Sequence, residues 1–117
     1  MSVTADTLDP EPLARWWAEQ LGASITHNYG GEFVLVSGGR LPVNLAFQKV
    51  PDPTPGKNRI HLDLGADDVE AEVERLVAAG ATLVARRGDE SFRWVTLADP
   101  AGNEFCVAPA SESDQTG

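Results

Sequence analysis

The sequence predicts an α+β fold built from two consecutive modules, each with the element order βαβββ. Two segments have the apolar spacing of amphipathic helices, and about eight short runs have the alternation or the composition of strands. A short internal repeat supports the division, because Gly-Ala-Ser-Ile at 22–25 follows the first helix as Gly-Ala-Thr-Leu at 80–83 follows the second. We therefore expect one domain of two related halves over residues 1–109.

Both helices have start and stop signals. The first is expected from Asp9, an N-cap, to Gly22, a C-terminal stop. The second is expected from Asp67 or Asp68 to Gly80, and its acidic first turn suits the helix dipole. The apolar stripes of the two helices are Leu13, Trp16, Trp17 and Leu21, and Val69, Val73, Leu76 and Val77.

Strands are expected between these helices and the turns rich in Gly, Pro and Asn. They cover residues 2–8, 23–29, 31–38, 41–50, 58–65, 81–87, 92–99 and 103–109. Residues 50–58 contain three prolines and form an extended linker between module one, 1–49, and module two, 59–109. The polar tail, 110–117, is expected to be disordered.

Composition excludes several classes of partner. The net charge of −9 over 117 residues repels nucleic acid and anionic membranes, so we expect neither as a partner. No apolar run is long enough to span a bilayer, and the N-terminal residues do not resemble a secretion signal. The single Cys106 cannot form an internal disulfide. A cytoplasmic location is therefore expected.

The residues at the ends of these elements resemble those of a known superfamily. His61 precedes the acidic helix start at Asp68, Ala-Gly at 79–80 follows the helix, and Asp-Pro-Ala-Gly-Asn at 99–103 precedes the last strand. In these motifs the chain resembles the glyoxalase, bleomycin-resistance and extradiol-dioxygenase superfamily, also called the vicinal oxygen chelate superfamily. The runs PGKNRIHLDL and LADPAGNEFCV are especially similar to its small glyoxalase-like subfamily. The resemblance implies a U-shaped, partly open eight-stranded barrel around a pocket, and a homodimer.

The resemblance also implies where a metal would bind. Metal-dependent members use His and Glu from the first and last strand of each module, and the matching positions here are Ser2, a position at or near Asn44, His61 and Cys106. Ser2 and Asn44 are poor ligands, and one His with one Cys falls short of the three protein ligands of a catalytic zinc. We therefore expect no obligatory metal. The alternative is one divalent ion, Zn, Ni, Mn or Fe, held by His61, Glu104 and Cys106.

The candidate site residues also have structural interpretations. Asp63 and Glu104 share a strand face with the ligand positions, so either carboxylate can approach His61 or complete a metal cluster with it. Equally, His61 is interpretable as a strand histidine bonded to one of these carboxylates, and Glu104 as a partner of its own turn. Cys106 is interpretable as a small buried apolar residue. Asp99 is expected to accept the amides of its turn.

Our leading hypothesis is a cytoplasmic, homodimeric glyoxalase-like protein that binds a small organic molecule in a pocket between its modules, without an obligatory metal. The expected lining is Asn44, Gln48, His61, Asp63, Trp94, Glu104 and Cys106. The competing hypothesis is a lyase or isomerase in which His61 and Glu104 bind a divalent ion or serve as general base and acid, with Cys106 as a third ligand. The arginines in the strands, Arg59, Arg86, Arg87 and Arg93, could meet an anionic ligand, but most of them are expected at the surface.

Overall fold

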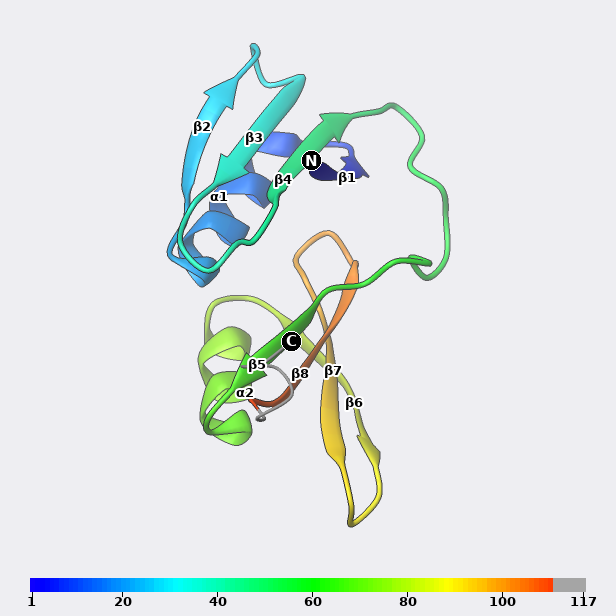
Figure 1. Cartoon of the computed structure of the whole chain (residues 1–117). Coiled ribbons are helices and arrows are strands. Elements are labelled where there is room, and N and C mark those ends of the chain that lie inside the picture. The colour runs from blue at the N-terminus through cyan, green and yellow to red at the C-terminus, as the bar shows by residue number, and fades with distance from the viewer. Residues whose placement is uncertain (111–117) are drawn as a thin grey trace. The chain divides into compact units, whose positions relative to one another are not determined.

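The computed structural model describes residues 1–110, and Figure 1 shows the path of the chain. Contacts divide the chain into two compact units, Met1–Pro55 and Gly56–Gly117, and the boundary falls inside the predicted linker. The predicted tail lies outside the described residues except for Ala110, whose amide donates to the carbonyl of Ala66 at 2.9 Å.

The observed elements confirm the α+β class and the two tandem βαβββ modules. The first unit contains β1 (Ser2–Thr7), α1 (Pro10–Leu21), β2 (Ser24–Asn28), β3 (Phe33–Ser37) and β4 (Asn44–Lys49). The second contains β5 (Asp63–Ala66), α2 (Val69–Ala78), β6 (Thr82–Gly88), β7 (Arg93–Ala98) and β8 (Glu104–Pro109). The barrel that the two sheets would form together stays a prediction.

Each unit has a four-stranded sheet with the same topology. The strand orders are β1-β4-β3-β2 and β5-β8-β7-β6, with the first strand parallel to the last and the other pairs antiparallel. The register shifts between Ile25 and His27 in β2, and between Leu83 and Ala85 in β6. Ile25 and Leu83 are aligned by the sequence repeat, so the two units have the same register shift at equivalent positions of β2 and β6.

The first helix agrees with its predicted bounds and apolar stripe. Gly22 ends α1 at φ 62°, a left-handed conformation that favours glycine. All four predicted stripe residues are buried. Both tryptophans belong to the core, because the rings of Trp16 and Trp17 pack edge to face with centroids 4.9 Å apart.

The second helix buries a narrower stripe than predicted. Asp68 caps α2 by accepting the amide of Ala71 at 3.1 Å. Val73 and Leu76 are buried, but Val77 is 42% exposed, so its assignment to the buried stripe was wrong. Val77 is rotated about 100° from Leu76 around the helix, which turns it off the face that meets the sheet. Neither helix of the described part is long and apolar enough to cross a membrane.

One face of each sheet packs under its helix, and this face holds the core of the unit. In the first unit α1 packs on β3 and β4, and in the second α2 packs on β8 and the strands beside it. The large apolar residues buried in the strands are Val34, Val36, Leu45 and Phe47 in the first unit and Val95, Leu97, Phe105 and Val107 in the second. They alternate with residues that point away from the helix, and in the second unit this opposite face forms the candidate site.

The predicted strand over 58–65 is shorter in the structure, because β5 begins at Asp63. Before it, the side chain of Asn58 takes the place of main-chain pairing with β8. Its Oδ1 accepts the amide of Glu104 at 2.7 Å, and its Nδ2 donates to the carbonyls of Glu104 and Ile60 at 3.0 and 2.8 Å. His61 therefore lies in an irregular segment held beside β8, and its placement within a strand was wrong.

Candidate functional site

The helix-distant face of the second sheet is hollowed into a pocket of about 650 Å3. On β8, Phe105 and Val107 are buried on the helix side, whereas Glu104, Cys106 and Ala108 lie on the opposite face. The pocket is lined by Lys57, His61, Asp63, Arg87, Phe92, Trp94, Thr96, Glu104, Cys106, Ala108 and Pro109. All of these residues belong to the second unit.

Five of the seven predicted lining residues surround this pocket: His61, Asp63, Trp94, Glu104 and Cys106. The other two, Asn44 and Gln48, lie on β4 of the first unit, where they pair with residues of β1 and β3. Their part in a binding site stays a prediction.

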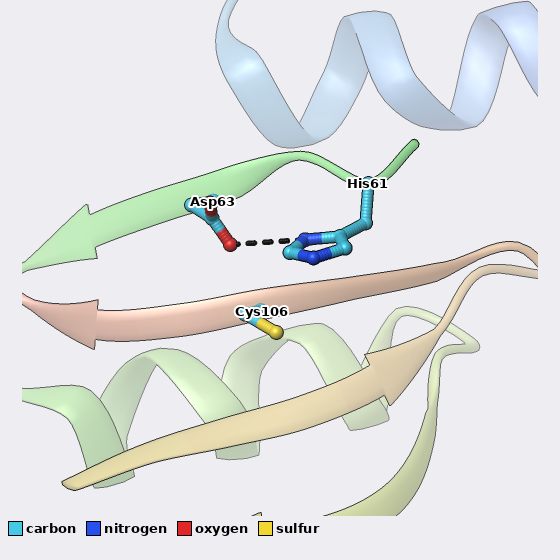
Figure 2. Close-up of side chains that lie close together, drawn as sticks. All are labelled: His61, Asp63 and Cys106. Carbon is cyan, nitrogen blue, oxygen red and sulfur yellow. Dashed lines mark ion pairs between the residues drawn. The ribbon is translucent and has the colours of Figure 1, made fainter. Parts of the chain in front are cut away.

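His61, Asp63 and Cys106 form a compact cluster, drawn in Figure 2. His61 Nδ1 lies 3.1 Å from Asp63 Oδ1, and one ligand atom from each of the three residues lies within 4.8 Å of the others. Asp63 and Cys106 are brought together because they are direct partners in the parallel pairing of β5 with β8. The side chains of His61 and Asp63 are 42% and 67% exposed, so both are accessible to a ligand from solvent.

Of the two carboxylates that could approach His61, Asp63 is the one that lies against it in the structure. Glu104, which the metal-binding alternative placed with His61 and Cys106, is outside the groups of possible ligands found among residues 1–110, and Asp63 takes that place. Glu104 Oε1 instead lies 3.8 Å from Lys57 Nζ, with the glutamate side chain 22% exposed. Lys57 was not predicted at the site, because it lies in the linker, where sequence periodicity gives no orientation.

A hydrogen-bonded chain of side chains crosses the floor of the pocket. The thiol of Cys106 lies 3.5 Å from the hydroxyl of Thr96, its cross-strand partner. Arg87 Nε donates to the same hydroxyl at 2.9 Å. Thr96 is 3% exposed, so this hydroxyl is a fixed, buried point between the thiol and the guanidinium. The sequence favoured the surface for most of the strand arginines, and only the position of Arg87 opposite Trp94 in the register of β6 and β7 reveals that it lines the pocket.

Two aromatic side chains form an apolar wall of the pocket. The rings of Phe92 and Trp94 are tilted by 36° with centroids 5.9 Å apart. Residues two apart on a strand share a face, which places Phe92, Trp94 and Thr96 on the same side. Phe92 is 49% exposed, which is high for a residue that could pack in a core. The two rings therefore lie at the pocket and not in the core of the unit.

The turn that precedes β8 is held by Asp99, as predicted. Asp99 is 4% exposed, and its Oδ1 accepts the amides of Ala101 and Asn103, each at 2.9 Å. Its Oδ2 also accepts the side-chain amide of Asn103 at 3.3 Å. Asp99 thus fixes where β8 starts and, with it, the register of Glu104 and Cys106.

The first unit does not repeat the cluster. Thr4 and Asp63 each lie five residues before the N-cap of their helix, and Thr4 pairs with Ala46 as Asp63 pairs with Cys106. Strand register therefore makes Ala46 the counterpart of Cys106. The family resemblance placed this position at or near Asn44, which lies two residues before Ala46 on the same strand face.

The donor set of the cluster fits a borderline-soft divalent ion. It offers one imidazole nitrogen, one carboxylate oxygen and one thiolate sulfur, and three protein ligands with an open position are typical of catalytic zinc. The contact between His61 Nδ1 and Asp63 also has a function without metal, because a carboxylate at Nδ1 orients the ring and leaves Nε2 available. The geometry therefore allows either use.

Several solved structures share the fold of this chain. A glyoxalase/bleomycin resistance protein/dioxygenase family enzyme from Burkholderia phytofirmans PsJN has a TM-score of 0.76 and 20% identity, covering 94% of this chain and 97% of its own. A lactoylglutathione lyase from Agrobacterium tumefaciens has a TM-score of 0.68 and 18% identity over 94% and 92% of the two chains. A bleomycin resistance determinant encoded on the transposon Tn5 has a TM-score of 0.67 and 17% identity over 95% and 97%. Identities this low show a shared fold and nothing finer.

Sequence comparison identifies the family. No curated protein matches the chain. The family model described as a glyoxalase-like domain matches residues 2–108, which is nearly the whole length. The chain therefore belongs to the glyoxalase-like domain family.

Proposed function

We propose that this protein binds a small organic molecule in the pocket of its second unit, without an obligatory metal. The observation that supports this most directly is the composition of one sheet face. The aromatic wall of Phe92 and Trp94 lies on the same pocket as the polar groups of His61, Asp63 and Thr96. An apolar surface with a few converging polar groups is the usual composition of a ligand site.

The size of the pocket agrees with this function. Its volume of about 650 Å3 falls within the range of about 300 to 1,000 Å3 that is typical of small-molecule sites. The pocket is open to solvent, and its polar groups come from several strands and the linker. A ligand would therefore be oriented by groups that the sheet and its connections hold at fixed separations.

The binding proposal is tested by screening small aromatic and polar fragments against the 15N-labelled protein. Fragments that bind should shift the amide resonances of Trp94, Thr96 and Cys106. Trp94→Ala should weaken their binding by roughly tenfold, since loss of a buried aromatic contact removes about 1.5 kcal/mol or more. Tyr29→Ala, which removes an aromatic ring that is 60% exposed in the first unit, is the control and should leave binding unchanged. Fragments that shift no pocket resonance would contradict the proposal.

A second candidate function is a divalent-metal-dependent lyase or isomerase, and the cluster of His61, Asp63 and Cys106 favours it. These three residues would hold the ion, which when bound would polarise a carbonyl or hydroxyl oxygen of the substrate as a Lewis acid. Glu104 lines the same pocket, 3.8 Å from Lys57, and would exchange a proton with the substrate. Among the similar structures, the name lactoylglutathione lyase agrees with the enzyme candidate. The name bleomycin resistance determinant agrees with the binding candidate.

Metal analysis separates the two candidates. Protein purified without chelator is measured by elemental mass spectrometry as wild type, as His61→Ala and as His27→Ala. The chain has two histidines, and His27 is an exposed residue of the first unit stacked on Tyr29, so its variant is a matched control. The leading proposal expects no stoichiometric metal in any of the three. Zinc, nickel, manganese or iron present in the wild type, lost in His61→Ala and kept in His27→Ala would favour the metal-dependent enzyme.

We also propose a homodimer in the cytoplasm. The dimer is supported by the family resemblance, and the location by a single cysteine that requires no oxidising compartment. Light scattering after size exclusion gives the mass in solution directly, and the expected value is twice that of the 12.5 kDa chain. A monomer at all concentrations would overturn the first proposal, and recovery of the native protein outside the cytoplasmic fraction would overturn the second.

A further inference from the structure

The charged groups of the pocket are paired with one exception. The imidazole of His61 lies against Asp63, and the ammonium group of Lys57 lies 3.8 Å from Glu104. Arg87 lines the same pocket, and within residues 1–110 no carboxylate forms an ion pair with it. Among residues 1–110, Arg87 is therefore the one basic side chain of the pocket without a carboxylate beside it, in a protein whose net charge is −9.

The guanidinium of Arg87 is held in place by a neutral group. Its Nε donates to the buried hydroxyl of Thr96 at 2.9 Å. This bond uses the Nε proton, and the two terminal amino groups have no partner among the residues that the structure describes. Two parallel N–H groups of a guanidinium match the two oxygens of a carboxylate. Arg87 is thus oriented as an anion receptor, although it is exposed to solvent.

The neighbouring arginine shows that this arrangement is specific to one face of the strand. Arg86 points to the helix side of β6, where its Nη2 donates to Glu70 of α2 at 2.7 Å. The hydrogen bond between these two side chains lowers the pKa of Glu70 and raises that of Arg86. Arg86 and Arg87 therefore have the same charge and adjacent positions, but only Arg87 faces the pocket without an anionic partner.

The aromatic wall lies next to this receptor. Arg87 is the direct cross-strand partner of Trp94, and the ring of Phe92 is 5.9 Å from that of Trp94. A molecule whose flat apolar part lies on these rings would place an attached acid group near the guanidinium of Arg87. The Cβ atoms of two directly opposite residues on neighbouring strands lie about 4.5 to 5.5 Å apart. A small aromatic acid is long enough to contact both side chains.

We propose that the ligand of this pocket is an organic acid, with a carboxylate bound by Arg87 and a planar apolar body on Phe92 and Trp94. This inference depends on the proposed binding function and specifies the class of its ligand. Thr96 is then a positioning residue, because it fixes the guanidinium without contacting the acid. The thiol of Cys106, which lies against the same hydroxyl, is at the floor of the site.

The test compares 2-naphthoate with its neutral amide, 2-naphthamide, which has the same shape without the charge. Binding of each is measured by 15N chemical-shift titration of wild type, Arg87→Gln and Arg86→Gln. The two variants change the net charge equally and alter adjacent residues of one strand. Wild type should bind the acid about tenfold or more tightly than the amide, as expected for charge-assisted hydrogen bonds. Arg87→Gln should abolish this preference, and Arg86→Gln should retain it.

The outcomes distinguish this inference from the proposed function. Equal binding of acid and amide to the wild type, with shifts in the pocket, would overturn the role of Arg87 and leave the binding function standing. An acid preference lost equally in both variants would also overturn it, because the preference would then depend on net charge. Pocket resonances that neither compound shifts would contradict the binding function and the inference together.

Discussion

The two units of this protein have the same topology and different chemistry. In each, a helix covers one face of a four-stranded sheet, and the first strand lies parallel to the last. The positions that hold Asp63 and Cys106 in the second unit hold Thr4 and Ala46 in the first. The same count from the helix start makes Ser2 the counterpart of His61. The same backbone register thus holds the cluster of His61, Asp63 and Cys106 in the second unit and the small side chains of Ser2, Thr4 and Ala46 in the first.

The units also differ in how the segment before the helix is held. In the first, β1 pairs with β4 through main-chain contacts over six residues. In the second, β5 has only four residues, and the side chain of Asn58 binds the main chain of Glu104 where the strand would have continued. Because the side chain of Asn58 holds this segment, the backbone around His61 is not part of a strand. The second unit therefore has an irregular segment at the edge of its pocket.

The largest effect is expected from removing a large side chain from the core of the second unit. Phe105 is 1% exposed under α2, and Phe105→Ala should lower the free energy of unfolding by about 3 to 5 kcal/mol, measured by urea denaturation. Phe92→Ala removes the same ring from the pocket face, where it is 49% exposed, and should cost less than about 1 kcal/mol. Equal losses for the two variants would show that the faces of the second sheet do not differ as described.

An intermediate effect is expected at the side-chain anchor. Asn58→Ala leaves the amide and carbonyl of Glu104 without their partner and should lower the free energy of unfolding by about 1 to 3 kcal/mol. Hydrogen exchange at the Glu104 amide should accelerate. The control is Asn28→Ala in the first unit, which removes one exposed hydrogen bond from the amide of Gly31 and should cost less than about 1 kcal/mol. Unchanged exchange at Glu104 would contradict the role of Asn58.

The smallest effect is expected in the hairpin that positions Arg87 and Phe92. The carboxylate of Asp89 accepts the hydroxyl and amide of Ser91 and the amide of Phe92, and these bonds hold the pKa of Asp89 below its ordinary value of 3.8. Since the folded pKa is the lower one, the stabilisation is complete above about pH 4 and is lost as pH falls through the folded pKa. The amide shifts of Ser91 and Phe92 should follow this loss.

Two variants check the assignment to Asp89. Asp89→Asn should remove the acid transition from the amide shifts of Ser91 and Phe92, because the side chain at this position no longer ionises. Glu90→Gln removes an equal charge one residue further along and should leave the transition in place. A transition that persists in Asp89→Asn would have to come from another carboxylate.

Much of the fold could be predicted, because it depends on local signals. Apolar periodicity and Gly22 located α1, and the motif at 99–103 located the turn that Asp99 holds. Errors arose where a non-local contact overrides the local pattern. The run around His61 alternates like a strand, yet an asparagine side chain pairs with β8 instead. Val77 continues an apolar stripe, yet only Val73 and Leu76 of α2 are buried.

The candidate site was predicted less completely. His61, Trp94, Glu104 and Cys106 were assigned to one pocket by alternation and family resemblance, and the structure brings them together. Lys57 and Arg87 were missed as members of it. Neither has a local signal for orientation, because Lys57 lies in the linker and Arg87 follows the register shift between Leu83 and Ala85 in β6. A bulge changes which face each later residue occupies, so the orientation of Arg87 depends on its pairing with Trp94.

The amino-acid sequence by itself determined the family, the order of the elements and the two tandem modules, since these follow from periodicity, capping residues and motifs along the chain. Only the tertiary structure decided which charged groups are paired. In it, Asp63 lies against His61 and Glu104 lies near Lys57. Arg87 lies beside Trp94, and its hydrogen-bond partner is the neutral hydroxyl of Thr96. The physical reason is that an ion pair depends on distances of a few ångströms between strands, and strand register and side-chain orientation set those distances.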